Sequence, residues 1–449
     1  MSAGCSFDGS GLSPQDGPAS VDAAHRDART NTIDAMPPGT IDAGTDAGLP
    51  PDAAPDAAPD AAPDAAPDAA PDAAPDAAED PCDVLGYDPS NIDCDDFLSV
   101  PGRAFHLTKG LSTIDTESAA SCPADLSCAI VDQDSGGPKV LFAMAKSVTI
   151  DSDATLQVTG SHPLVLLSVG DVRIAGRVAV VSNTASRLAC TAGDGESAQP
   201  GQGYDDGPGG GGGGFGTAGG NGGQGKANGG DNSDETLGGG AQNGQGSLVP
   251  LRGGCNGGRG GDATNLPSVA GIGGDGGGGG GAIQISSGAS ITVAGHIVAP
   301  GGGGAGASED KASVDLLCGD AGGGGGGAGG SIFLEAPNID LRATSVLGAT
   351  GGGGGAGCKD GGLSTDADDG EGGHDATGGS GGDGHDKNED ANGGNGAGDG
   401  DADGANGHQS GNGGAGGGGG GVGRIHLRSR QKAQTDGQIQ GASTESNLP

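Results

Sequence analysis

Six residues at 399–404 have the types and spacing of the first half of a calcium-binding loop. Asp399, Asp401 and Asp403 alternate along the chain, and Gly404 follows them. Alternate aspartates in such a loop direct their oxygens at one ion, and the glycine permits a sharp turn. Ser410 stands where the closing bidentate glutamate belongs, so the match is partial. The pattern indicates either weak calcium binding at these four residues or a solvated acidic loop.

Other residues that could carry chemistry are scattered along the chain. His374, His385 and His408 share the same acidic region, as a loose metal site or as solvated loop histidines. The glycine-rich text holds no G-x-x-x-x-G-K-[ST] phosphate loop, and no G-x-S-x-G stands between a strand and a helix. The positions expected to face outward contain no aromatic residue and no carboxylate pair, so we predict that the protein is not an enzyme.

An alternating apolar pattern that recurs from residue 140 onward supplies the elements that must position these residues. It is clearest at 282–304, where short alternating runs are separated by Gly-Ala or Ala-Gly steps. Matching text recurs at 164–178, 332–346 and 425–439, and 140–158 resembles one more copy. Period-2 alternation indicates strands with one buried face. The apolar positions expected inside include Val140, Phe142, Ile283, Ile285, Ile291, Val293, Ile332 and Leu334.

Each copy contains three short strands that cannot bury their apolar faces alone. Stacked copies give every strand a neighbour above and below and form one continuous core. We therefore predict an all-β fold, a β-solenoid that is parallel β-helix-like, with a β-sandwich as the competing arrangement. The outward positions Gln284, Thr292 and His296 are expected to be exposed, and Glu335 is also expected to face outward.

Three long glycine-rich insertions, at about 182–281, 300–330 and 348–423, all fall at one corner of this repeat. Each lies between the third strand of one copy and the first strand of the next. Ordering glycine is costly in backbone entropy. The insertions are therefore either disordered loops or closely packed polyglycine II-like strands, since only glycine tolerates such close backbone approach.

The last copy is unusually basic for this chain. It contains Arg424, Arg428, Arg430 and Lys432. These residues indicate either a polar final coil that blocks pairing at the open edge or a docking site for an acidic partner.

Composition limits the partners and the compartment. The net charge of −39 argues against nucleic acid as a partner, because phosphates are repelled by such a surface. Of the nine cysteines, eight remain when Cys5 is set aside, and an even number indicates an oxidising compartment. Proximity in sequence favours the pairs Cys82–Cys94 and Cys122–Cys128, and Cys190–Cys255 is favoured because both residues lie in one insertion, which leaves Cys318–Cys358.

The N-terminal part differs in composition from the rest. Residues 1–81 are predicted to be a disordered lipoprotein-type N-terminus and linker, with seven Pro-Asp-Ala-Ala copies at 51–78 that favour an extended stalk. Residues 82–139 are predicted to form an N-terminal cap with paired cysteines, and 140–449 the glycine-rich solenoid. Ser2-Ala3-Gly4-Cys5 looks like the end of a bacterial lipobox, so Cys5 is either a lipidation site, with a hydrophobic run expected upstream of Met1, or incidental.

Together these features resemble the glycine-rich predicted surface lipoproteins of the myxobacterial type. The likeness rests on Cys5, the PDAA stalk, the paired cysteines and the text GGGGGGAGGSIFLEA at 322–336. It implies an exported protein anchored by an N-terminal lipid at the outer membrane or cell surface. We expect a non-enzymatic structural or adhesive role. The alternative is an exported β-helix that acts on or binds polysaccharide, with an extracellular polymer as its partner.

Overall fold

The computed structural model describes a chain that is almost entirely β. The described residues are 81–96, 103–181, 190, 192–199, 203–227, 234–266, 269–309, 319–358, 367–383, 391–398, 403–408 and 413–449. All of these residues belong to the unit Ala73–Pro449. Residues 1–80, with Cys5 and the predicted stalk, lie outside the described residues. Within this part of the chain the helices are the short 3₁₀ helices η1 (Pro81–Val84), η2 (Cys94–Asp96) and η3 (Ala119–Ser121). No helix among these residues is long and apolar enough to cross a membrane.

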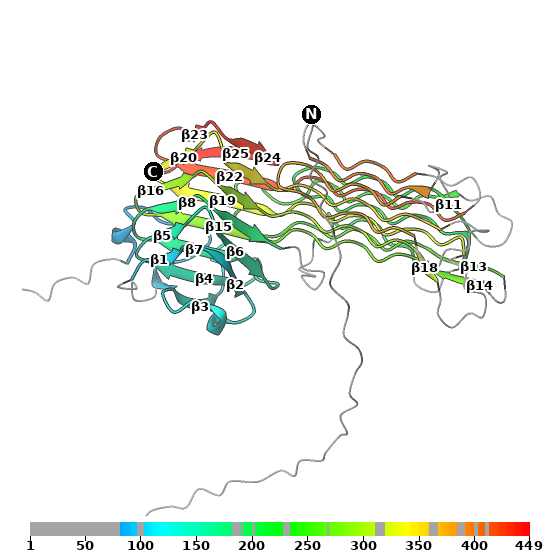
Figure 1. Cartoon of the computed structure of the whole chain (residues 1–449), viewed down its shortest axis with the longest axis horizontal. Helices are drawn as coiled ribbons and strands as arrows, with labels where there is room; N and C mark the ends of the chain where they lie inside the picture. The colour runs from blue at the N-terminus through cyan, green and yellow to red at the C-terminus, as the bar shows by residue number, and fades with distance from the viewer. Residues whose placement is uncertain are drawn as a thin grey trace, which may run out of the picture. The chain divides into compact units, whose positions relative to one another are not determined.

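Most strands belong to three sheets that grow together along the chain (Figure 1). Sheet A contains β1 (Phe105–Leu107), β5 (Val148–Ile150), β8 (Val172–Ile174), β16 (Ser290–Val293), β20 (Asn338–Leu341) and β23 (Gln434–Thr435). Sheet B contains β2 (Gly110–Asp115), β6 (Ala154–Thr159), β9 (Arg177–Val180), β17 (His296–Val298), β21 (Val346–Gly348) and β24 (Gln438–Gln440). Sheet C contains β3 (Ser127–Val131), β4 (Val140–Ala145), β7 (Leu164–Ser168), β15 (Ala282–Ser287), β19 (Ser331–Ala336), β22 (Arg424–Ser429) and β25 (Ala442–Asn447).

The strand order follows directly from the sequence repeat. Each successive copy adds one strand to sheet C, one to sheet A and one to sheet B, and all these strands pair in parallel except β3 with β4. Ile283 lies opposite Leu164 and Ile332, and Ile291 lies opposite Val172 and Ile339. The register predicted for these copies is therefore correct. A smaller sheet D forms within the insertions from β10 (Gly203–Asp206), β11 (Gly225–Ala227), β12 (Asp234–Glu235), β13 (Asp262–Leu266), β14 (Val269–Ile272) and β18 (Ser308–Glu309).

One hydrophobic cluster contains inward side chains from sheets A, B and C. Ile283, Ile285, Ile291, Ile332 and Leu334 are fully buried in it, as predicted. Burial of these branched side chains on stacked parallel strands supplies the core that a single copy lacks.

The outer face of sheet C is also buried, and here two predictions were wrong. Gln284 and Glu335 have no exposed surface, although both were expected to face solvent. Val140 and Phe142 belong to a second hydrophobic cluster, on this outer face, while Leu141 faces the inner core and pairs with Leu164. In β4 and β7, where the outer face is covered by apolar side chains, the strands are continuous apolar runs, so alternation there does not reveal which face is inside.

The segment predicted as a cap covers two different surfaces. Around β3, Leu126 and the Cys122–Cys128 disulfide pack against the inner core. Residues 81–96, closed by the Cys82–Cys94 disulfide, instead place Leu85, Tyr87 and Ile92 in the cluster on the outer face of sheet C.

Three of the four basic residues in the C-terminal coil contact other parts of the protein. Arg424 lies 5.6 Å from the centre of the Phe215 ring, Arg428 pairs with Glu335, and Arg430 donates to the carbonyl of Gly86. Beyond them, β25 aligns Ser443 and Glu445 with the core residues Ile425 and Leu427 of β22. Both of these β25 residues are exposed. This arrangement fits the polar final coil better than docking of an acidic partner.

Candidate functional site: a bundle of glycine segments

The three glycine-rich insertions pack together into one bundle of extended segments that run side by side (Figure 1). We call this element the glycine bundle. Its segments are 192–199, 207–225, 237–243, 253–261, 273–281, 299–307, 320–330, 349–358, 367–383, 391–398, 403–408 and 413–423. Of the two alternatives for the insertions, close packing is what these residues adopt.

Hydrogen bonds between the segments repeat every third residue. The N–H groups of Gly323, Gly326 and Gly329 donate to the carbonyls of Ala415, Gly418 and Gly421 at 2.8 to 3.0 Å. A polyproline II-type helix has three residues per turn, so every third N–H points in the same direction. This is the pattern expected of polyglycine II-like strands.

Segment 320–330 is surrounded by hydrogen-bonded neighbours on six sides. It donates N–H bonds to segments 253–261, 299–307 and 413–423, and it accepts them from 207–216, 273–281 and 349–358. When the two halves of 207–225 and of 367–383 are counted separately, 207–216, 349–358 and 413–423 also exchange bonds with six neighbours each. Most backbone groups of these four adjacent central segments are therefore satisfied by other backbone groups.

Close approach explains why the central segments are nearly pure glycine. A Cβ added to Gly325 would come well under 3.0 Å from the carbonyl oxygen of Gly211, and one on Gly326 would approach Gly352 in the same way. The obstructing atoms are backbone, which cannot rotate away. At these two positions no side chain fits between the segments.

Several outer segments instead carry a polar residue at every third position, as in Asn256-Gly-Gly-Arg259-Gly-Gly-Asp262. These side chains accept hydrogen bonds from the neighbouring backbone. Asn221 accepts from Gly239, Asn256 from Gly279 and Asn395 from Gly381, at 2.8 to 2.9 Å. The amides and carboxylates thus satisfy N–H groups where no further segment covers the bundle.

The predicted calcium residues fall on this rim. Asp399 and Asp401 lie outside the described residues. Asp403 is exposed and accepts a 3.2 Å hydrogen bond from the N–H of Ala218, whose carbonyl accepts from Gly404. A Cβ on Gly404 would meet the carbonyl of Gly419, so close packing accounts for this glycine. Calcium binding stays a prediction, with two of its four residues placed.

The histidines of the third insertion are placed separately. His374 pairs with Glu371 at 3.3 Å, His408 is exposed, and His385 lies outside the described residues. Asp369 accepts a 2.7 Å hydrogen bond from the N–H of Gly306, another contact of the rim type.

One ion-pair cluster connects the glycine bundle to sheet B. Arg177 of β9 and His296 of β17 are neighbours in register, and both contact the Oδ2 atom of Asp375 from the third insertion. Burial opposes ionisation of Asp375, but the hydrogen bonds and charges of Arg177 and His296 outweigh burial and lower its pKa. The cluster fixes the turn around Asp375 against the outer face of sheet B.

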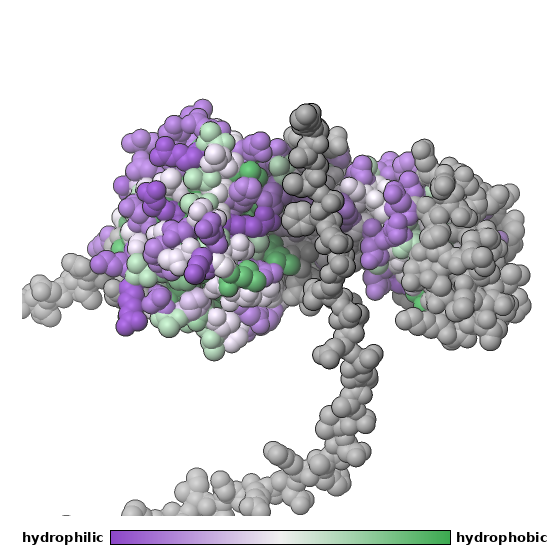
Figure 2. Space-filling model, in the orientation of Figure 1, coloured by the Kyte–Doolittle hydropathy of each residue, from purple (hydrophilic) through white to green (hydrophobic). Residues whose placement is uncertain are grey.

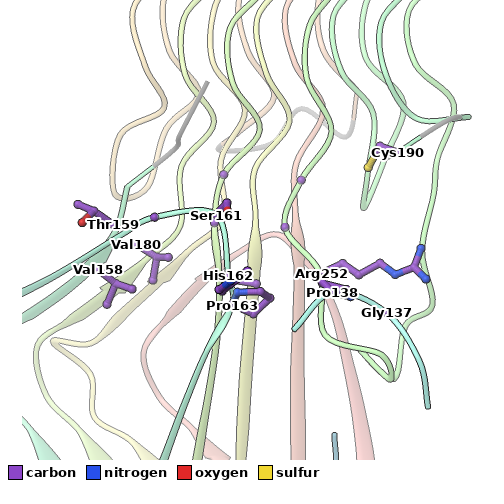
Figure 3. A pocket seen from close by; sticks show the side chains of 16 residues that line it. Gly137, Pro138, Val158, Thr159, Ser161, His162, Pro163, Val180, Cys190 and Arg252 are labelled. Atoms are coloured by element: carbon purple, nitrogen blue, oxygen red, sulfur yellow. The ribbon is translucent and has the colours of Figure 1, made fainter. Parts of the chain in front are cut away.

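A cavity of about 230 Å³ lies where the bundle meets sheets B and C (Figure 3). Val158, Val180, Pro138 and Pro163 form much of its apolar lining. Its polar side chains are Thr159, Ser161, His162 and Arg252, and no carboxylate is among its described lining residues. In Figure 3 the guanidinium of Arg252 points away from His162. The arrangement suits a small apolar group better than a charged one.

Disulfides join the cysteine pairs favoured in the sequence analysis. Cys190–Cys255 joins the chain just before segment 192–199 to segment 253–261, across 65 residues. Cys358 is also disulfide-bonded, whereas Cys318 lies outside the described residues, so the fourth pair stays a prediction.

The coloured surface in Figure 2 is largely hydrophilic over the strand region, with small hydrophobic areas between. Leu111 is the most exposed of the large hydrophobic residues described. No protein-family model, curated protein or solved structure matches this chain.

Proposed function

We propose that this chain is a non-enzymatic, lipid-anchored structural or adhesive protein of the cell surface. In this proposal the three-sheet part is a β-solenoid of the parallel β-helix type. The strand order supports it, because every copy adds one strand to each of three sheets and shares one core with its neighbours. The glycine bundle then projects from one corner of that solenoid.

The observation that carries the proposal is the six-sided packing of the central glycine segments. Such a bundle is held by backbone hydrogen bonds and leaves its polar side chains on its rim, while its interior contains glycine and a few small buried residues. It therefore suits a stiff element that presents a surface, since a loose loop would need no such restriction to glycine. An adhesive or structural protein uses stiffness of this kind to hold contacts at a fixed distance from its base.

Export is supported by the cysteines. The Cys82–Cys94, Cys122–Cys128 and Cys190–Cys255 pairs lie in three different parts of the fold. Disulfides persist in oxidising compartments and are rare in the cytosol. Cys5, in the lipobox-like Ser2-Ala3-Gly4-Cys5, is the residue that would carry the lipid anchor in this proposal.

The experiment is surface labelling of intact host cells, combined with mass spectrometry of the N-terminal peptide. We expect protease and antibody access to the folded unit and a lipid on Cys5. Adhesion is measured with cells that carry Gly325→Val, which disrupts the bundle, and Gly372→Ala as the matched control. Protein found in the cytosol, or adhesion unchanged by Gly325→Val, would reject the proposal.

Polysaccharide binding is the second candidate, and a row of side chains on sheet A favours it. His106, Thr149, Arg173, Thr292, Asp340 and Gln434 lie opposite one another on six successive strands. Neighbouring strands are about 4.8 Å apart, so the row presents hydrogen-bonding groups at regular spacing across the sheet. A glycan panel that binds wild type and loses binding in Arg173→Ala would support this candidate, with reducing-sugar release testing for catalysis.

A further inference from the structure

Residues 81–96, which we call the clasp, contribute no strand to any sheet and yet bury several of their side chains. Leu85, Tyr87 and Ile92 are each less than a tenth exposed. They pack with Phe333 and Phe142 on the outer face of sheet C. The Cys82–Cys94 disulfide closes the clasp into a loop, so that it docks as one piece.

The clasp is centred on Glu335 of β19, a fully buried carboxylate. Arg428 of β22 forms an ion pair with it. Ser90 donates to the same carboxylate from its N–H at 3.1 Å and from its hydroxyl at 3.0 Å. A buried carboxylate that lost these partners would be strongly destabilising, so the clasp and the sheet stabilise each other here.

Two further residues extend the contact to β15. The Tyr87 hydroxyl lies 3.1 Å from the carbonyls of Ser287 and of Glu335. Asn91 donates to the side chain of Gln284 at 2.8 Å, and Gln284 donates to the carbonyl of Ser90 at 2.8 Å. The clasp thus crosses three adjacent strands, β15, β19 and β22.

By contrast, β1 and β2, which follow the clasp, each pair with one neighbouring strand in the part of the chain that the structure describes, and they contribute Phe105 and Ile114 to the core. β1 pairs with β5, and β2 pairs with β6, at the ends of sheets A and B. A pull on β1 would open such pairs one after another. The same pull on the clasp must break its contacts with three strands together, because they lie side by side in one sheet.

We propose that the clasp is the mechanical anchor through which load on the N-terminal region enters the folded unit. Residues 1–80 precede it in the chain, so tension from that side reaches the clasp before it reaches β1. The load then passes into the middle and C-terminal strands of sheet C and spares the edge strands β1 and β2. The role under tension rests on the proposed surface anchoring, whereas the docking itself does not.

The test is single-molecule pulling on the purified full chain, with one handle at the N-terminus and the other on a tag inserted at the exposed turn between Ser152 and Asp153. We expect a discrete undocking step before β1 and β2 detach. In Ser90→Ala with Asn91→Gly, that step should occur about tenfold faster at fixed load, since several buried hydrogen bonds are lost while glycine accepts the positive φ of 68° at this position. Asp88→Ala, an exposed neighbour in the clasp, is the matched control and should behave as wild type.

Circular dichroism and thermal unfolding establish that each variant is folded. If the double variant fails this check, Tyr87→Phe, which removes only a hydroxyl, replaces it and should also shorten the undocking time. Detachment of β1 and β2 without an earlier step, or equal undocking times in all variants, would overturn the proposal. Because the measurement uses purified protein, its outcome is independent of whether labelling finds the chain on cells.

Discussion

Gly325 and Gly211 lie so close that a single methyl group on Gly325 would collide with the carbonyl oxygen of Gly211. Both residues belong to central segments of the glycine bundle, and they come from different insertions. Their contact shows that the insertions form one packed element rather than separate loops.

Gly325→Ala should therefore destabilise the protein by about 3 kcal/mol, because the obstructing atoms are backbone and the bundle must open to admit the methyl group. Gly372→Ala is the control, since a Cβ there would meet only the carbonyl of Gly301 at an ordinary 3.5 Å. It should change stability by less than about 0.5 kcal/mol. Chemical denaturation followed by circular dichroism measures both, and equal stabilities would contradict the packing.

A second prediction concerns the polar rim of the glycine bundle. Asn256→Ala removes the acceptor of the Gly279 N–H bond of 2.9 Å. Hydrogen exchange of the peptide that contains Gly279 should become about tenfold faster, the equivalent of about 1.4 kcal/mol. Asp275→Ala, an exposed neighbour, should leave exchange of Gly279 unchanged. Unaltered exchange in Asn256→Ala would show that the rim side chains do not protect the bundle.

His426 makes a prediction about pH. Burial, aided by the charge of Arg428, lowers the pKa of His426 to about 4 from the ordinary 6.5. The unfolded chain therefore binds more protons than the folded chain between these values. The lowered pKa of His426 therefore contributes up to about 3 kcal/mol to the free energy of unfolding. This contribution is fully present above pH 6.5 and is lost as the pH falls toward 4.

His426→Gln should flatten this part of the stability profile, because glutamine keeps a hydrogen-bonding group near Thr444 and Ser446 but does not titrate in this range. Stability is compared between pH 7 and pH 4.5 by chemical denaturation. His408→Gln, at an exposed position, is the control, because the many carboxylates that titrate in the same pH range are present in both variants. Parallel profiles for wild type and His426→Gln would contradict the assignment.

The C-terminal end makes a fourth prediction. Ser443 and Glu445 occupy inward register positions on β25 and are exposed. Ser443→Val with Glu445→Leu should create an apolar open end and cause concentration-dependent association. Light scattering after size exclusion measures it, with the exposed Lys432→Leu as control. A double variant that stays monomeric at every concentration tested would show that the polar end does not prevent stacking.

The disulfides differ in the length of chain that they close. Cys190–Cys255 spans 65 residues and Cys122–Cys128 spans 6. From chain entropy, replacing the first pair by serines should cost about 4 kcal/mol and replacing the second about 2 kcal/mol. Denaturation of the two double variants measures the difference, and the reverse order would point to effects other than loop closure.

The sequence by itself determined the strands and their register where one face is buried and the other is not. Ile291, Thr292 and Val293 alternate visibly, and β16 has the burial that this alternation predicts. The sequence also contained evidence for the glycine bundle. The Gly-Gly-x period in Asn256–Asp262 matches the three-residue turn of polyglycine II. Glycine content alone is compatible with disordered loops as well as with packed strands.

Only the tertiary structure decided what covers each surface. Gln284 and Glu335 look like outward polar residues on an ordinary strand, and they are buried because the clasp, from about 190 or more residues earlier in the chain, lies over them. Likewise, a glycine run does not specify its neighbours, since every segment offers the same backbone groups. Which segments become central depends on hydrogen bonds between insertions far apart in sequence, and local patterns contain no information about such pairings.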